Sequence, residues 1–140
     1  MNLQVADGVH ILTLTNAENG GDNRLTTEVV EEYLAALDIV EQYQGNTALL
    51  LTCSHEKTFC TGINLDWLLP LNDADRREFT TAFETLLCRL ALLSAPTVAC
   101  INGNAYAGGA IVASATDFRL MRSDRGRFCY PEVDIKIPFT

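Results

Sequence analysis

The chain has 140 residues, of which 48% are hydrophobic and 20% charged, values that fit one compact domain and exclude a disordered or repetitive protein. Its formal net charge of −8 argues against nucleic acid and anionic membranes as partners, because binding to either needs basic residues. We expect no secretory signal at the start of the chain. The uncharged stretch between Arg89 and Asp117 contains Pro96 and several glycines, which disfavour a membrane span.

The five cysteines are widely and irregularly spaced, with no C-x-x-C pair, which disfavours zinc-ribbon and thioredoxin-like sites. Most of them lie in apolar stretches, so we expect reduced, buried thiols in a cytoplasmic protein. His10 and His55 are isolated in the sequence and lack the spacing of metal ligands. We therefore expect no metal site and two exposed histidines.

The first part of the chain predicts a hairpin and a helix. Two alternating apolar segments, residues 3–5 and 9–14, flank Asp7-Gly8, which is a typical hairpin turn. A polar loop follows. Thr26-Thr27 can then cap a helix, whose apolar residues recur at helical spacing until Gly45 ends the pattern.

The middle of the chain predicts two buried strands with a helix between them. The short apolar run 47–53 indicates a strand buried on both faces, and residues 54–62 are predicted to form a loop. Asn72 can cap a long amphipathic helix that Pro96 ends. A second buried strand is predicted over residues 97–101.

The last part predicts a Gly-rich turn over 103–109, a short helix over 110–115, and strands over 117–121 and 127–130. The alternation of strands and helices is typical of right-handed βαβ crossovers and a mainly parallel sheet, so the expected fold class is α/β. Residues 135–140 end in apolar sequence with no closing helix. We expect either that the chain is a fragment or that a partner covers this end.

Two loops follow neighbouring predicted strands, at the sheet edge where α/β proteins bind ligands. They span residues 57–66 and 102–110. Gly108-Gly109 opens a helix, so the backbone there can approach a ligand and present N–H groups. Two such loops could direct two N–H donors at one oxygen atom, as in an oxyanion hole. Taken by itself, the glycine pair is more simply explained by tight packing of a helix against a strand.

The ordered set of these motifs resembles the crotonase family, that is, enoyl-CoA hydratase/isomerase. The motifs that carry the resemblance are residues 59–65, 96–109, 117–119 and 131–135. The resemblance covers nearly the whole chain but only the N-terminal half of a family member. It implies a ClpP/crotonase-like fold for residues 1–140, a spiral of ββα turns truncated before the C-terminal helical region.

The resemblance implies an acyl-CoA substrate, no separate cofactor because CoA belongs to the substrate, and a homotrimer or hexamer for a full-length protein. The backbone N–H groups of Ile63 and Gly108 would stabilise the enolate oxygen. With Glu132, these are the implied catalytic residues. The implied substrate-binding residues are Thr61, Ile63, Asn64, Leu65, Gly108, Gly109 and Ile111.

Hydratases of this family carry two glutamates, one of them three residues after the oxyanion glycine. Here Ile111 occupies that position, and the second glutamate is present as Glu132. A single carboxylate resembles the Δ3,Δ2-enoyl-CoA isomerases, because a 1,3-proton shift needs only one base. An apolar residue at position 111 would also keep water from the dienolate. Asp134 is an alternative base, since in a strand it would share a face with Glu132.

Other functions stay open at this point. The same oxyanion hole could serve hydration, thioester hydrolysis, decarboxylation or dienoyl isomerisation, and a truncated chain could be a non-catalytic acyl-CoA-binding or assembly module. Ala107 and Lys136 stand where relatives often have glycine. Four basic residues could meet CoA phosphates or could be surface charges: Arg24, Lys57, Arg76 and Arg77.

Overall fold

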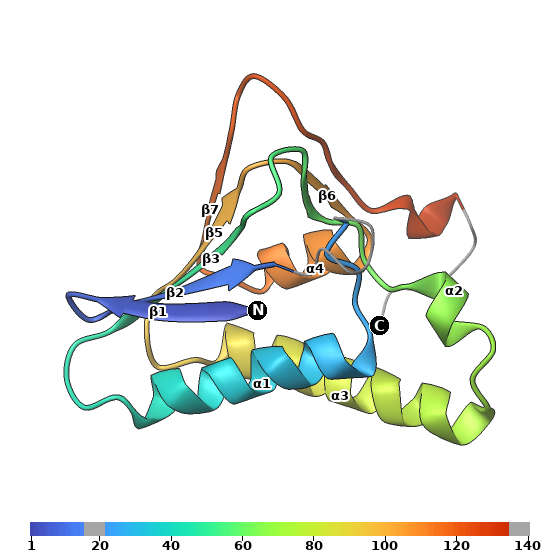
Figure 1. The fold of residues 1–140 in the computed structure, drawn as a ribbon, viewed down its shortest axis with the longest axis horizontal. Coiled ribbons are helices and arrows are strands. Elements are labelled where there is room, and N and C mark those ends of the chain that lie inside the picture. Colours follow the sequence, from blue (N-terminus) through green and yellow to red (C-terminus); the bar gives the residue numbers. More distant parts are fainter. Residues whose placement is uncertain (16–21, 135–140) are drawn as a thin grey trace.

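The computed structural model describes residues 1–15 and 22–134, which form two β-sheets and several helices (Figure 1). The larger sheet has the order β1-β2-β3-β5-β7, with bounds Asn2–Ala6, Val9–Leu14, Ala48–Cys53, Thr97–Ile101 and Phe118–Met121. The smaller has the order β4-β6-β8, with bounds Thr58–Cys60, Asn104–Tyr106 and Phe128–Cys129. The helices are α1 (Thr27–Gln42), α2 (Leu65–Leu68), α3 (Asp73–Ala91), α4 (Gly108–Ser114) and the 3₁₀ helix η2 (Pro131–Val133).

The strand order follows a repeating unit of two strands and one helix. β1 and β2 form the predicted antiparallel hairpin, and β2, β3, β5 and β7 are parallel to one another. From β3 onward, each turn adds one strand to the larger sheet, one to the smaller sheet, and then a helix: β3-β4-α3, β5-β6-α4 and β7-β8-η2. This is the expected spiral of ββα turns.

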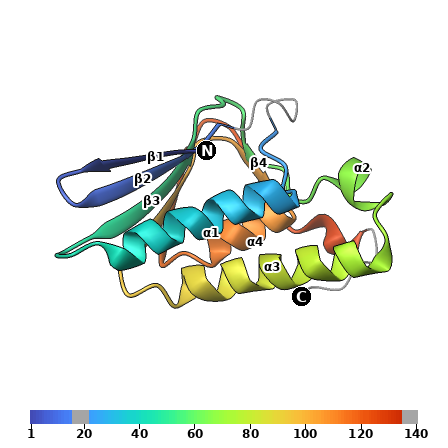
Figure 2. The same ribbon diagram turned by 60° about the horizontal axis from the view of Figure 1, so that its bottom comes forward.

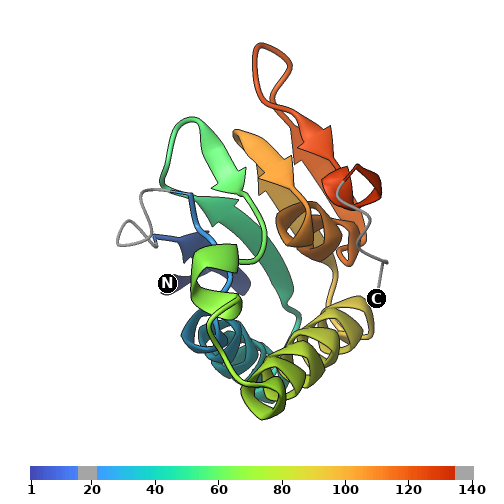
Figure 3. The same cartoon turned by 90° about the vertical axis from the view of Figure 1, so that its right-hand side faces the viewer.

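The helices enclose the core between themselves and the sheets. α1 and α3 lie along one side of the molecule, with the strands on the other (Figure 2), and α4 lies inside, between these helices and the smaller sheet (Figures 1 and 3). The inward side chains of β3 and β5 are almost inaccessible, as are the apolar faces of α1 and α3. No helix in the described ranges is long and apolar enough to cross a membrane.

Both predicted helix caps are confirmed. The Thr26 side chain accepts a hydrogen bond from the Val29 N–H at the start of α1. The Asn72 side chain accepts bonds from Ala74 and Asp75 at the start of α3. Each cap satisfies N–H groups that have no partner inside the helix. The starts of α1 and α3 were therefore readable from local sequence alone.

The short elements near the carboxyl ends of the larger sheet were missed. β4 lies inside the segment predicted as a loop, β6 lies inside the predicted turn, and α2 was not foreseen. Strands of three residues are too short to show an alternating pattern, and their pairing depends on neighbouring turns of the spiral. The predicted polar loop before α1 includes residues 16–21, which lie outside the described residues, as do Lys136 and the apolar end at 135–140.

The expectation of exposed histidines was wrong. His10 is fully buried, because alternation along β2 places it on the inward face with Leu12 and Leu14. Its Nδ1 lies 2.8 Å from the Thr47 Oγ1, and that hydroxyl donates to the Gly8 carbonyl. Because the Thr47 hydroxyl donates its only hydrogen to Gly8, it accepts the bond from His10, whose Nδ1 therefore carries a hydrogen. His55 is half-buried.

The cysteines divide into two groups. Cys53 and Cys60 are buried as expected and Cys100 is half-buried, whereas Cys88 and Cys129 are exposed, contrary to expectation. Cys88 lies in α3, and Cys129 lies in β8, where both strand residues are exposed. Apolar sequence context alone did not reveal which way each side chain points.

Candidate active site

The first site loop, residues 57–66, is held by a short parallel contact with the segment before α1. Leu25 N donates to the Gly62 carbonyl over 2.8 Å, and Asn64 N donates to the Leu25 carbonyl over 2.9 Å. In extended chain, successive N–H groups alternate in direction, so the Ile63 N–H points away from Leu25. Gly62 has a φ of +92°, a left-handed conformation that favours glycine and turns the chain at this point.

The second site loop joins β6 to α4 through Ala107. Ala107 has φ 49° and ψ −128°, which is strained for a residue with a side chain. Glycine, which the resemblance led us to expect here, would adopt this conformation without strain. α4 then begins at Gly108, two residues earlier than predicted.

The two loops approach each other backbone to backbone. A Cβ atom added to Gly62 would lie 2.9 Å from the Gly108 nitrogen, and one added to Gly109 would lie 2.3 Å from the Cys60 carbonyl oxygen. Neither position has room for a side chain. Among the described residues, the N–H groups of Ile63 and Gly108 have no hydrogen-bond acceptor. The loops thus bring two available donors into one small region.

Glu132 lies in η2, the helix that follows the last described strand. Only 7% of the residue is exposed, and its Oε2 atom is buried without a hydrogen-bond partner among the described residues. A buried polar atom without a partner is costly, which marks Glu132 as a candidate functional residue. Asp134 is exposed, because the segment is a 3₁₀ helix and not a strand, so the two carboxylates do not share a face.

The segment before Glu132 is fastened to the second loop and α4. Ala107 N donates to the Cys129 carbonyl over 3.0 Å, at the end of the β6–β8 pairing. The Tyr130 hydroxyl is hydrogen-bonded to the Ser114 hydroxyl at the end of α4. Figure 3 shows η2 (red) and α2 (green) on either side of α4 (orange). Sequence reasoning missed this connection, because nothing in the sequence relates Tyr130 to Ser114.

The other predicted substrate-binding residues lie around the first loop and α4. The Asn64 side chain caps α2 by accepting from the Trp67 N–H and also accepts from Arg24. Thr61 and Ile111 are half-buried, whereas 42% of Leu65 is exposed. Arg24 also pairs with Asp66 at 3.0 Å, so this candidate CoA contact is part of a surface ion pair.

Two buried thiols belong to this region, Cys53 at the end of β3 and Cys60 within the first loop. Burial raises the pKa of Cys60 to about 12 and also raises the pKa of Cys53. Both therefore stay protonated at neutral pH, and the thiolate is the nucleophilic form of cysteine. This argues against a cysteine nucleophile here. Asn102, another residue that sequence reasoning missed, donates its amide to the carbonyls of Cys53 and His55 and so ties the start of the second loop to the end of β3 and the residues that follow it.

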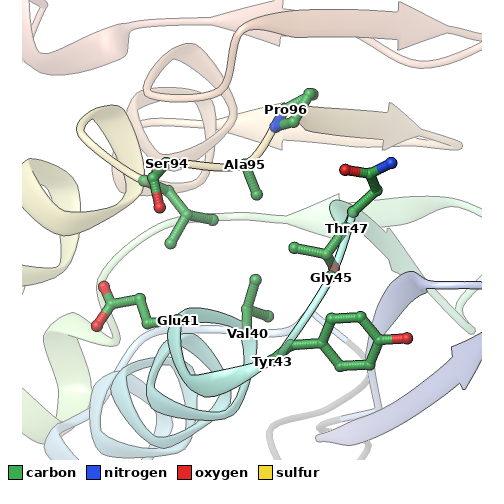
Figure 4. Close-up of a pocket in the computed structure, with 10 residues that line it drawn as sticks. Val40, Glu41, Tyr43, Gly45, Thr47, Ser94, Ala95 and Pro96 are labelled. Carbon is green, nitrogen blue, oxygen red and sulfur yellow. The ribbon is translucent and has the colours of Figure 1, made fainter.

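A pocket of about 400 Å³ lies at the other end of the larger sheet (Figure 4). It is formed by the end of α1, the turn before β3 and the segment between α3 and β5. Its lining residues are Val40, Glu41, Tyr43, Gly45, Asn46, Thr47, Leu93, Ser94, Ala95 and Pro96. None of the predicted site residues is among them. The pocket is therefore separate from the loops that carry the candidate chemistry.

Comparison with known proteins agrees with this arrangement. The family model for enoyl-CoA hydratase/isomerase matches residues 4–137. The chain belongs to this family. Its fold is therefore crotonase-like, and the described part corresponds to only a portion of the complete fold. Enoyl-CoA delta isomerase 3 from Arabidopsis thaliana is 30% identical over 139 residues, which are 97% of this chain and 57% of that protein.

A hydratase of the family has the same percentage identity over a shorter stretch. The short-chain-enoyl-CoA hydratase from Clostridium acetobutylicum is 30% identical over 115 residues, covering 82% of this chain and 44% of that protein. An enoyl-CoA hydratase structure from Geobacillus kaustophilus HTA426 superposes with a TM-score of 0.88 at 23% identity, covering 96% of this chain and 50% of that one. The chain thus spans about half the length of the relatives it matches. Its cytoplasmic location stays a prediction.

Proposed function

We propose that the chain forms the site of an enoyl-CoA isomerase, which moves a double bond from position 3 to position 2 of an acyl-CoA. The observation that carries this proposal is the burial of Glu132, whose Oε2 atom has no hydrogen-bond partner within residues 1–15 and 22–134. α4, which in a hydratase would carry the second glutamate, has the sequence GGAIVAS and contains no acidic residue. A buried carboxylate that follows a segment bonded to the second loop, together with two backbone donors that have no acceptor among the described residues, suits a proton shift that needs a single base.

In the proposed reaction, the N–H groups of Ile63 and Gly108 bind the thioester carbonyl oxygen. The Glu132 carboxylate removes a proton from C2, and the electron pair of that C–H bond spreads over a dienolate whose oxygen the two donors stabilise. Protonated Glu132 then returns the proton to C4, which leaves the double bond between C2 and C3. Each oxyanion donor of this kind typically contributes about 10²–10³-fold to the rate.

The preference for isomerisation over hydration rests on position 111. Hydration needs a group that activates water as well as one that protonates carbon, and α4 supplies no second acid. Ile111 is half-buried on α4, three residues after Gly108. An aliphatic side chain there would exclude water from the dienolate, and water is the reactant that hydration requires.

The test is to incubate the purified chain with 3-hexenoyl-CoA and follow the formation of 2-hexenoyl-CoA. Replacing Glu132 with Gln should lower turnover about 10²–10⁴-fold, because the base is lost while its shape is kept. Asp134→Asn is the matched control, since it removes one charge from the same segment at an exposed position and should leave turnover unchanged. Full activity in Glu132→Gln, or 3-hydroxyacyl-CoA as the main product, would refute the proposal.

A further inference from the structure

Asn23 is a buried polar residue in the segment that lies beside the first site loop. Sequence reasoning placed it in a polar loop, but only 4% of it is exposed, and its Nδ2 atom donates to the Phe59 carbonyl over 2.9 Å. Phe59 is the middle residue of β4, where the pairing with β6 is irregular. An irregularity of this kind interrupts the ladder of backbone hydrogen bonds between two strands. The Asn23 amide supplies a donor at this point.

The backbone of Asn23 also faces the first site loop. Its φ of 49° is left-handed, and asparagine is one of the few residues with a side chain that adopt this conformation readily. In extended chain, successive carbonyl groups point to opposite sides. Here the Asp22 carbonyl accepts from the Thr61 N–H over 3.1 Å, and the Asn23 carbonyl accepts from the Cys60 thiol over 3.0 Å. The left-handed turn thus directs two successive carbonyl groups at the same loop.

Residues 22–25 hold the first site loop on both sides of Ile63. The Leu25 carbonyl accepts from the Asn64 N–H over 2.9 Å, and the Leu25 N–H donates to the Gly62 carbonyl over 2.8 Å. The Ile63 N–H itself has no acceptor among the described residues, so its neighbours fix its direction. A donor of this kind acts on charge that develops in the transition state, and misplacing it by about 1 Å can cost about 10²-fold in rate.

We propose that Asn23 is a positioning residue that aims the Ile63 N–H at the thioester oxygen. Its left-handed backbone and its side-chain amide fix the start of the loop, the latter through the Phe59 carbonyl. The inference rests on the proposed function, because it takes Ile63 as an oxyanion donor. A residue that only stabilised the fold would affect this loop no more than it affects the rest of the molecule, and that difference can be measured.

Amide hydrogen exchange, followed by NMR, tests the effect on the loop without any substrate. Asn23→Gly deletes the side-chain amide and keeps the left-handed backbone, which glycine adopts freely. It should speed exchange of the hydrogen-bonded Thr61 and Asn64 amides about tenfold or more. Thr47→Val is the matched control, because it also removes a side-chain bond to a carbonyl, that of Gly8, but at the other end of the larger sheet. It should leave exchange at both loop amides as in wild type.

The wild-type chain gives a second measurement that does not depend on how the variants fold. The Nδ2 hydrogens of Asn23 should exchange about tenfold or more slowly than those of the exposed Asn46, because Asn23 is buried and its amide is bonded. Equal rates at the two side chains would overturn the proposal. So would unchanged exchange of Thr61 and Asn64 in an Asn23→Gly variant that circular dichroism shows to be folded.

Isomerisation kinetics supply the functional readout. Asn23→Gly should lower kcat about tenfold or more and change KM less than about twofold, because the donor that it positions acts mainly in the transition state. Thr47→Val should keep the wild-type kcat. An equal fall in kcat in both variants, or a fall in neither, would overturn the positioning role. A wild-type chain without turnover would contradict the proposed function alone, because the exchange measurements need no reaction.

Discussion

The two ends of the larger sheet are stabilised in different ways. At the carboxyl end, the loops touch through backbone atoms, with Gly109 against the Cys60 carbonyl and Gly62 against Gly108. At the amino end, side chains make the contacts, as in the hydrogen bond between His10 and Thr47. Chemistry that uses backbone N–H groups needs the first arrangement, because the donors are fixed by the path of the chain. Substitutions that add atoms should therefore destabilise the protein most at the carboxyl end, and substitutions that remove polar groups should destabilise it most at the amino end.

The largest effect on stability is expected from Gly109→Ala. The new methyl group would lie 2.3 Å from the Cys60 carbonyl oxygen, and backbone atoms cannot move aside as a flexible side chain can. We expect a loss of about 3 kcal/mol or more in the free energy of unfolding, measured by urea denaturation. Gly108→Ala is the matched control, because its nearest contact is the Leu25 side chain at 3.1 Å. Equal losses in the two variants would contradict the backbone account.

The amino end offers a test through pH. Asp117 accepts hydrogen bonds from the Thr97 N–H and hydroxyl, both at 2.8 Å, and these bonds lower the pKa of its carboxyl group. A carboxyl whose pKa is lowered in the folded state stabilises the fold above its ordinary pKa. That contribution is lost as pH falls through the lowered value.

Asp117→Asn should therefore be less stable than wild type at neutral pH, and the difference should shrink on acidification below the ordinary carboxyl pKa. Chemical denaturation at a series of pH values measures it. A difference between the two proteins that stays constant down to strongly acidic pH would show that the charge of Asp117 is not involved.

The smallest expected effect concerns Ala107, the one residue of the second loop with a strained backbone. Its φ of 49° favours glycine, so Ala107→Gly should relieve strain while adding some entropy to the unfolded chain. We expect a net stabilisation of about 1 kcal/mol or less, visible as a small rise in melting temperature. A clear loss of stability would mean that the Ala107 methyl group packs usefully against Gly62.

Local sequence predicted the long elements of this fold well and the small ones poorly. The caps at Thr26 and Asn72 and the apolar runs of β3 and β5 act over a few residues, so the sequence shows them directly. β4 and β6 depend on pairing between turns of the spiral, which no local pattern records. The buried position of His10 follows from alternation along β2, so the sequence alone could have predicted it.

In the candidate site, too, local motifs were predictable from the sequence and contacts between distant segments were not. Its two loops were placed by their glycines, and Glu132 by its position in the family motif. The burial of the Glu132 Oε2 atom, without a hydrogen-bond partner in the described part of the chain, and the bond between Tyr130 and Ser114 depend on how distant segments pack, so only coordinates reveal them. The same is true of the exposure of Asp134, which separates the two candidate bases.

The account depends most on one carboxylate carrying the same proton from C2 to C4. A 3-enoyl-CoA substrate labelled with two deuterium atoms at C2, converted in ordinary water and analysed by NMR, tests this directly. A substantial fraction of the 2-enoyl-CoA product should carry deuterium at C4, because the buried Glu132 transfers part of the label from C2 to C4 before it exchanges with solvent. Product that contains only solvent hydrogen at C4 would contradict the single-carboxylate shuttle.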